Sequence, residues 1–88
     1  MNTVATCPSE WLETFFEEKS LDDRLYEIDH DGQTHFITST RVISLIHEAT
    51  EREQEAIKRT LIRIDFHNGD VHDFLKHLAT GYIKTNFS

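Results

Sequence analysis

The chain has 88 residues, 38% of them apolar, and a formal net charge of −7. This length and composition fit one small soluble domain and exclude a multidomain or disordered protein. The excess of acid disfavours partners that carry phosphate, so we expect neither nucleic acid nor a membrane surface to bind. Cys7 is the only cysteine, which excludes an internal disulfide and favours a reducing, cytoplasmic location.

Residues 1–8 are predicted to form a flexible tail, and residues 9–88 a single α+β domain. Ser9 is a candidate N-cap for a helix of about ten residues. Four apolar side chains of that helix are expected on one buried arc: Trp11, Leu12, Phe15 and Phe16.

A β-hairpin is predicted next, because RLYEIDHDGQTHFIT alternates between apolar and polar residues around Asp31-Gly32. An Asp-Gly step favours the type I′ turn, which needs positive φ at both central residues. This turn sets three pairs on one face: His30 with Gln33, Ile28 with His35, and Tyr26 with Ile37. That face is expected to pack on helices, since an isolated hairpin is barely stable in water.

Two helical patterns follow the hairpin. Ser39 or Thr40 is a candidate cap for the first, whose apolar stripe is predicted to be Val42, Leu45, Ile46 and Ala49. Thr50 and Glu53 have the spacing of a capping box, so a new helix is expected to begin there.

The stretch IDFHNGDVHDF, residues 64–74, supports two interpretations: a second hairpin, or a corner between two helices. The corner is favoured because glutamates lie early and bases late in the preceding segment, the charge order that a helix dipole stabilises. An ion pair between Glu55 and Arg59 is expected on that helix.

In the corner interpretation, Asn68-Gly69 ends one helix, with Gly69 in the left-handed region. Asp70 then caps the last helix. The apolar stripe of this last helix is predicted to be Val71, Phe74, Leu75, Leu78 and Tyr82. The predicted architecture is therefore an N-terminal helix, one hairpin, and three helices packed on it.

The chain has six histidines, and histidine is the commonest protein ligand of metals. A metal or haem site built from His30, His35, His67 and His72 is one hypothesis, although their spacing matches no zinc signature. A satisfied core position is the favoured interpretation of His35. No nucleophile, glycine-rich loop or paired Cys–His motif indicates catalysis, so we expect no enzyme activity and no cofactor.

One helix carries a candidate partner site. Ile62 and Phe66 are four residues apart, opposite the predicted buried stripe, and Arg59 and Arg63 flank them. Large apolar side chains rimmed by arginine are typical of interface centres, but burial of both faces of a central helix would give the same pattern. We therefore expect a small acidic protein that binds another protein and forms homodimers, with histidine-based metal or haem binding as the alternative.

Overall fold

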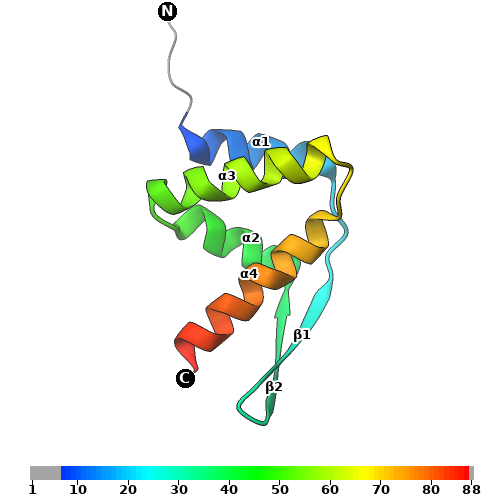
Figure 1. Cartoon of the computed structure of the whole chain (residues 1–88), viewed down its shortest axis with the longest axis vertical. Helices are drawn as coiled ribbons and strands as arrows, with labels where there is room; N and C mark the ends of the chain where they lie inside the picture. The colour runs from blue at the N-terminus through cyan, green and yellow to red at the C-terminus, as the bar shows by residue number, and fades with distance from the viewer. Residues whose placement is uncertain (1–6, 88) are drawn as a thin grey trace, which may run out of the picture.

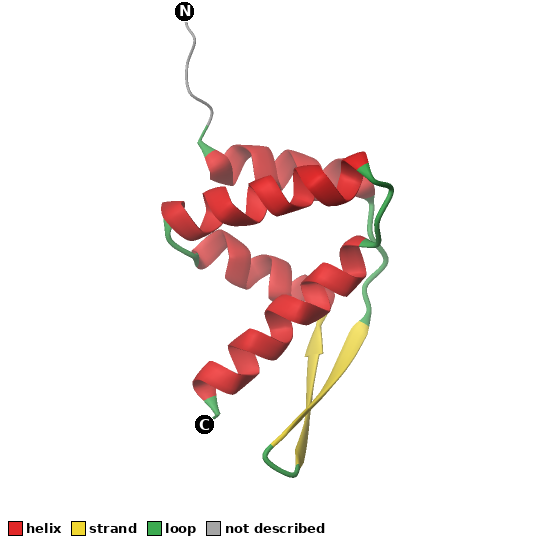
Figure 2. Ribbon diagram, in the orientation of Figure 1, coloured by secondary structure: helices red, strands yellow, loops and turns green. Residues whose placement is uncertain are grey.

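The computed structural model describes residues 7–87 and contains four helices and one two-stranded antiparallel sheet (Figures 1 and 2). In chain order the elements are α1 (Pro8–Lys19), β1 (Leu25–His30), β2 (Gln33–Thr38), α2 (Ser39–Glu48), α3 (Glu51–Phe66) and α4 (Val71–Asn86). The predicted α+β architecture is confirmed. None of the described helices is long and apolar enough to cross a membrane.

The first helix begins before the predicted position. Pro8 is its first residue, and Cys7 is the N-cap without a side-chain cap hydrogen bond, so the predicted cap at Ser9 is wrong. Proline fits here because its fixed φ suits a helix and its missing N–H is not needed in the first turn. Pro8 is buried, and only residues 1–6 of the predicted tail lie outside the described residues.

The hairpin has the predicted register, with Tyr26 opposite Ile37 and Ile28 opposite His35. Asp31 and Gly32 have φ of 55° and 75°, as a type I′ turn requires. The predicted inner face packs on α4 and α2, and the hairpin extends away from α1 and α3 (Figure 1).

The helices enclose a single core. α1 and α3 lie side by side, α2 lies beyond α3, and α4 crosses in front of α2 (Figure 1). Every element contributes apolar side chains to the core, whose buried members are Leu12, Phe15, Tyr26, Ile28, Ile37, Val42, Ile46, Leu61, Val71, Leu75, Ala79 and Ile83.

The bend between α2 and α3 is fixed by polar side chains. The predicted capping box is confirmed, since Thr50 and Glu53 each accept a hydrogen bond from the other's backbone N–H. Gln54 is buried and its amide donates to the carbonyls of Ile46 at 2.9 Å and His47 at 3.2 Å, which adds side-chain donors to the carbonyls at the end of α2. At the start of α2 the cap is Thr38, one residue before the predicted candidates.

The corner between α3 and α4 is confirmed, and the second hairpin is excluded. Asp70 caps α4 as predicted, accepting the His72 N–H at 2.9 Å. The left-handed residue, however, is Asn68, with φ of 55°, and not Gly69. Gly69 is suited to close packing instead, because a Cβ there would lie 3.1 Å from Cγ2 of Ile64.

The buried stripe of α4 is rotated from the predicted one. His72, Leu75, Ala79 and Ile83 are buried, whereas Phe74, Leu78 and Tyr82 are only partly buried. The reason is that α4 packs mainly on α2 and β1 and makes few contacts with α3, so the side facing α3 stays partly open.

We expect Asn68→Val to lower the free energy of unfolding by about 1–2 kcal/mol, because a β-branched residue is strained at positive φ. Asn68→Gly is the matched control, since glycine adopts this conformation without strain. Thermal unfolding followed by circular dichroism measures both. If the valine variant melts at the same temperature as the glycine variant, the left-handed conformation of residue 68 is contradicted.

Candidate functional site

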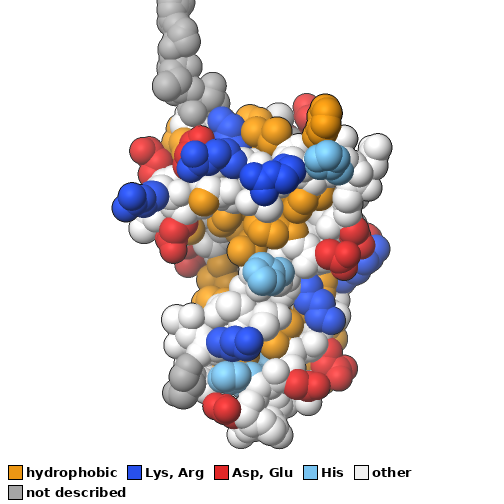
Figure 3. All heavy atoms as spheres, in the orientation of Figure 1, with side chains coloured by type: hydrophobic (Ala, Val, Ile, Leu, Met, Phe, Trp, Pro, Cys, Tyr) orange, Lys and Arg blue, Asp and Glu red, His pale blue; other side chains and the backbone are white. Residues whose placement is uncertain are grey.

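The outward side of α3 exposes two large apolar side chains one helical turn apart. Phe66 is 81% exposed and Ile62 is 46% exposed, so burial of both sides of this helix is excluded. Arg59 and Arg63 are exposed beside them. We call these four residues the α3 face. Figure 3 shows a row of Lys and Arg side chains over α3, with hydrophobic side chains next to it.

The two arginines of the α3 face make no ion pair with any described residue, and the predicted pair between Glu55 and Arg59 is not formed. Asp65, the acid next to Phe66 in sequence, is engaged by Lys19 of α1. Within residues 7–87, no carboxylate therefore competes with an acidic partner for either guanidinium group.

A shallow apolar pocket of about 130 Å³ lies between α2, α3 and α4, where α4 makes few contacts with α3. Ile46, Ile57, Leu78 and Tyr82 are among its lining residues, and Glu53 is the one charged residue there. The partly buried side of α4 thus faces a hollow large enough for one apolar side chain.

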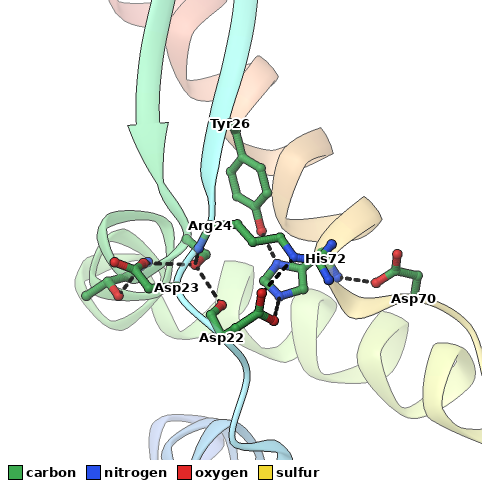
Figure 4. Close-up of polar contacts among 8 residues, drawn as sticks. Asp22, Asp23, Arg24, Tyr26, Asp70 and His72 are labelled. Atoms are coloured by element: carbon green, nitrogen blue, oxygen red, sulfur yellow. Dashed lines mark hydrogen bonds and ion pairs between the residues drawn. The ribbon is translucent and has the colours of Figure 1, made fainter.

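A buried chain of hydrogen bonds joins β1, α4 and the linker between α1 and β1 (Figure 4). The Tyr26 hydroxyl lies 2.6 Å from Nδ1 of His72, and Nε2 of His72 lies 3.1 Å from a carboxylate oxygen of Asp22. A neutral imidazole satisfies both contacts: Tyr26 donates to Nδ1, and the Nε2–H donates to Asp22. His72 is only 5% exposed, so both ring nitrogens are paired as burial requires.

The same linker is fastened to the start of α2. Ser39 accepts the Arg24 N–H at 2.9 Å and donates to the Asp23 carboxylate, which also accepts from the Thr40 hydroxyl at 2.8 Å. The Thr40 and Ser39 hydrogen bonds lower the pKa of Asp23, and those from Arg24 and His72 lower the pKa of Asp22. A carboxyl whose pKa is lower in the folded chain stabilises the fold above its ordinary pKa and loses that contribution as the pH falls.

Burial has the opposite effect on the phenol of this cluster. Desolvation raises the pKa of Tyr26, which keeps the phenol in its neutral form. The cluster therefore consists of groups that satisfy one another, with Asp22 at its exposed end.

The four histidines of the metal hypothesis do not form one site, because each has different neighbours. His72 belongs to the buried chain, His67 is exposed beside Phe66, and His30 lies 3.4 Å from Asp31 at the hairpin turn. His35 is half-buried and its ring lies 4.7 Å from that of Phe87, so the buried core histidine is His72 and not His35. Within residues 7–87, no three His, Cys, Asp or Glu side chains are grouped to hold a metal ion.

The sequence did not predict the contact between Asp22 and His72. Their partnership spans 50 residues, and no local pattern reports such a contact. One signal was present: His72 precedes Leu75 and Ala79 by three and seven residues, spacings that place it on their side of the helix.

We expect Tyr26→Phe and His72→Leu each to lower the free energy of unfolding by about 1–3 kcal/mol, because each leaves its buried partner unsatisfied. The double variant should lose less than the sum, since it removes both polar groups together. Urea unfolding followed by fluorescence of Trp11, the only tryptophan, measures all three. Strictly additive losses would contradict direct coupling between Tyr26 and His72.

Comparison of the chain with known proteins finds no matching family model, no matching curated protein and no matching solved structure. The exposure, charge and hydrogen bonding of this chain are therefore the evidence on its function. The α3 face is the part of the predicted site that these features single out.

Proposed function

We propose that this chain is a non-enzymatic protein–protein interaction module that self-associates through the α3 face. The observation that carries this proposal is the exposure of Ile62 and Phe66 on the same side of α3 as the exposed Arg59 and Arg63. Aromatic residues and arginine are the types most enriched at interface centres, and a water-exposed phenylalanine gains free energy when a partner covers it.

The size of the α3 face sets the expected strength of binding. Burying Phe66 and Ile62 contributes about 1.5–3 kcal/mol each, whereas association itself costs about 4–15 kcal/mol. The two side chains of one copy therefore offset little more than this cost, so the association they support alone is weak, with a dissociation constant well above the micromolar range. Such affinity suits a reversible module better than a permanent dimer.

The net charge of the chain limits which classes of molecule can be its partner. A net charge of −7 repels phosphate, so the partner is a protein and neither nucleic acid nor a membrane. Cys7 is free and exposed, which accords with action in the reducing cytoplasm.

A non-enzymatic role is supported by the state of the Asp22–His72–Tyr26 cluster, whose residue types resemble catalytic machinery. Tyr26 and His72 are buried and hydrogen-bond to each other, and Asp22 is paired with Arg24. A catalytic base or nucleophile needs access to its substrate. The cluster therefore stabilises the fold. The side chains exposed on the α3 face are of the types that bind other proteins.

Phe66→Asp is expected to abolish self-association, because it replaces the most exposed large apolar side chain of residues 7–87 by a charge. Sedimentation velocity from about 10 µM to about 1 mM extends to the concentrations at which such weak association becomes visible. The wild type should show a rising mean mass, and the variant should remain monomeric.

Phe87→Asp is the matched control, since Phe87 is also exposed but lies at the end of α4, outside the α3 face. This variant should associate as the wild type does. A wild type that stays monomeric at every concentration would refute self-association. A Phe66→Asp variant that associates as the wild type does would show that the chain does not associate through the α3 face.

A further inference from the structure

The hairpin exposes a second apolar surface on the side facing away from the helices. Leu25 and Phe36 are 63% and 61% exposed. They are diagonal neighbours, because Leu25 pairs with Thr38 and Glu27 pairs with Phe36 in the register. Glu27 and Asp29 are exposed on the same side. We call Leu25, Glu27, Asp29 and Phe36 the hairpin outer face.

The charges of this surface are opposite to those of the α3 face. Glu27 makes no ion pair with a described residue, and Asp29 accepts only the Thr34 hydroxyl at 2.8 Å. Arg24, the base next to Leu25, is already paired with Asp22. The hairpin outer face is therefore apolar and acidic, whereas the α3 face is apolar and basic.

This charge pattern decides between the ways in which two copies can meet. A symmetric contact between two α3 faces would bring arginines together, and a symmetric contact between two hairpins would bring carboxylates together. Like charges placed opposite each other weaken an interface. Pairing one face with the other brings Arg59 and Arg63 opposite Glu27 and Asp29 and covers the apolar side chains of both.

The other acidic surface of the chain lacks the apolar part. α1 carries exposed glutamates, but the large apolar side chains that are exposed in the described chain lie elsewhere: Leu25, Phe36, Ile62, Phe66 and Phe87. Of the acidic surfaces, the hairpin outer face alone offers apolar area to match Ile62 and Phe66.

We propose that the chain assembles head to tail, with the hairpin outer face of one copy bound to the α3 face of the next. This rests on the self-association proposed above and identifies its second surface. The hairpin extends away from α3 (Figure 1), so a copy can bind one neighbour through each face, and a row of copies has one free face of each kind, at its two ends. Such contacts build open chains or rings and not closed two-fold dimers.

Two variants that each disable one face test this arrangement. Phe66→Asp prevents binding through the α3 face and leaves the hairpin outer face intact. Phe36→Lys prevents binding through the hairpin outer face and leaves the α3 face intact. Both side chains are exposed, so the fold should survive, and circular dichroism checks it. If Phe36→Lys fails to fold, Leu25→Lys replaces it. Labelling one variant at Cys7, the only cysteine and exposed, lets sedimentation velocity follow it in mixtures.

Each variant alone should be monomeric, with self-affinity at least about tenfold below that of the wild type. Mixed in equal amounts, the two should form a complex of two chains and nothing larger, because only one functional pair of faces remains. The wild type should form species beyond a dimer, and salt raised to about 500 mM should weaken both assemblies.

The outcomes separate this inference from the proposed function. A monomeric wild type refutes both. A wild type that associates, together with a Phe36→Lys variant that associates equally well, leaves the proposed function standing and overturns the head-to-tail arrangement. A wild type that associates while the mixed variants form no complex overturns it also.

Discussion

The Asp22–His72–Tyr26 hydrogen-bond chain is the constraint on which the rest of the molecule depends. A two-stranded hairpin is not stable alone, and here Tyr26 anchors its base to the first turn of α4 through His72. Asp22 extends the same chain into the linker from α1, and Ser39 fastens that linker to α2. One buried imidazole thus ties together segments 46 and 50 residues apart, where an unpaired polar group would destabilise the core.

Fixing the hairpin in this way determines which surfaces are left exposed. Its inner face covers part of α4 and α2, so Leu25 and Phe36 necessarily face outward. At the other end of the molecule α1 occupies the side of α3 that carries Lys58, whose ammonium lies 5.7 Å from the Trp11 ring centre. Ile62 and Phe66 remain uncovered. The two apolar surfaces are therefore consequences of the fold, and their opposite charges make them complementary.

The features that sequence predicted correctly all depend on local interactions. The hairpin register follows from Asp31-Gly32, the capping box from Thr50 and Glu53, and the corner from the cap at Asp70. Apart from the helix caps of α1 and α2 and the ion pair on α3, which are local, the errors arose where tertiary contacts decide. The glycine in the corner packs against Ile64 while Asn68 takes the left-handed conformation, and α4 is rotated because its main neighbours are α2 and β1. For the candidate site, sequence placed Ile62 and Phe66 opposite the core, but only the fold established that residues 7–87 leave both side chains exposed.

The central claim is that two distinct surfaces of the same chain meet in its assemblies, and a dilution series of amide spectra by nuclear magnetic resonance tests it most directly. Raising the concentration of the wild type should shift the amides of residues 59–66 and those of residues 25–29 and 34–38 together. Both sets should follow one dissociation constant, because each contact uses one surface of each kind. Shifts confined to one of the two surfaces, or centred on the pocket between α2, α3 and α4, would contradict the account.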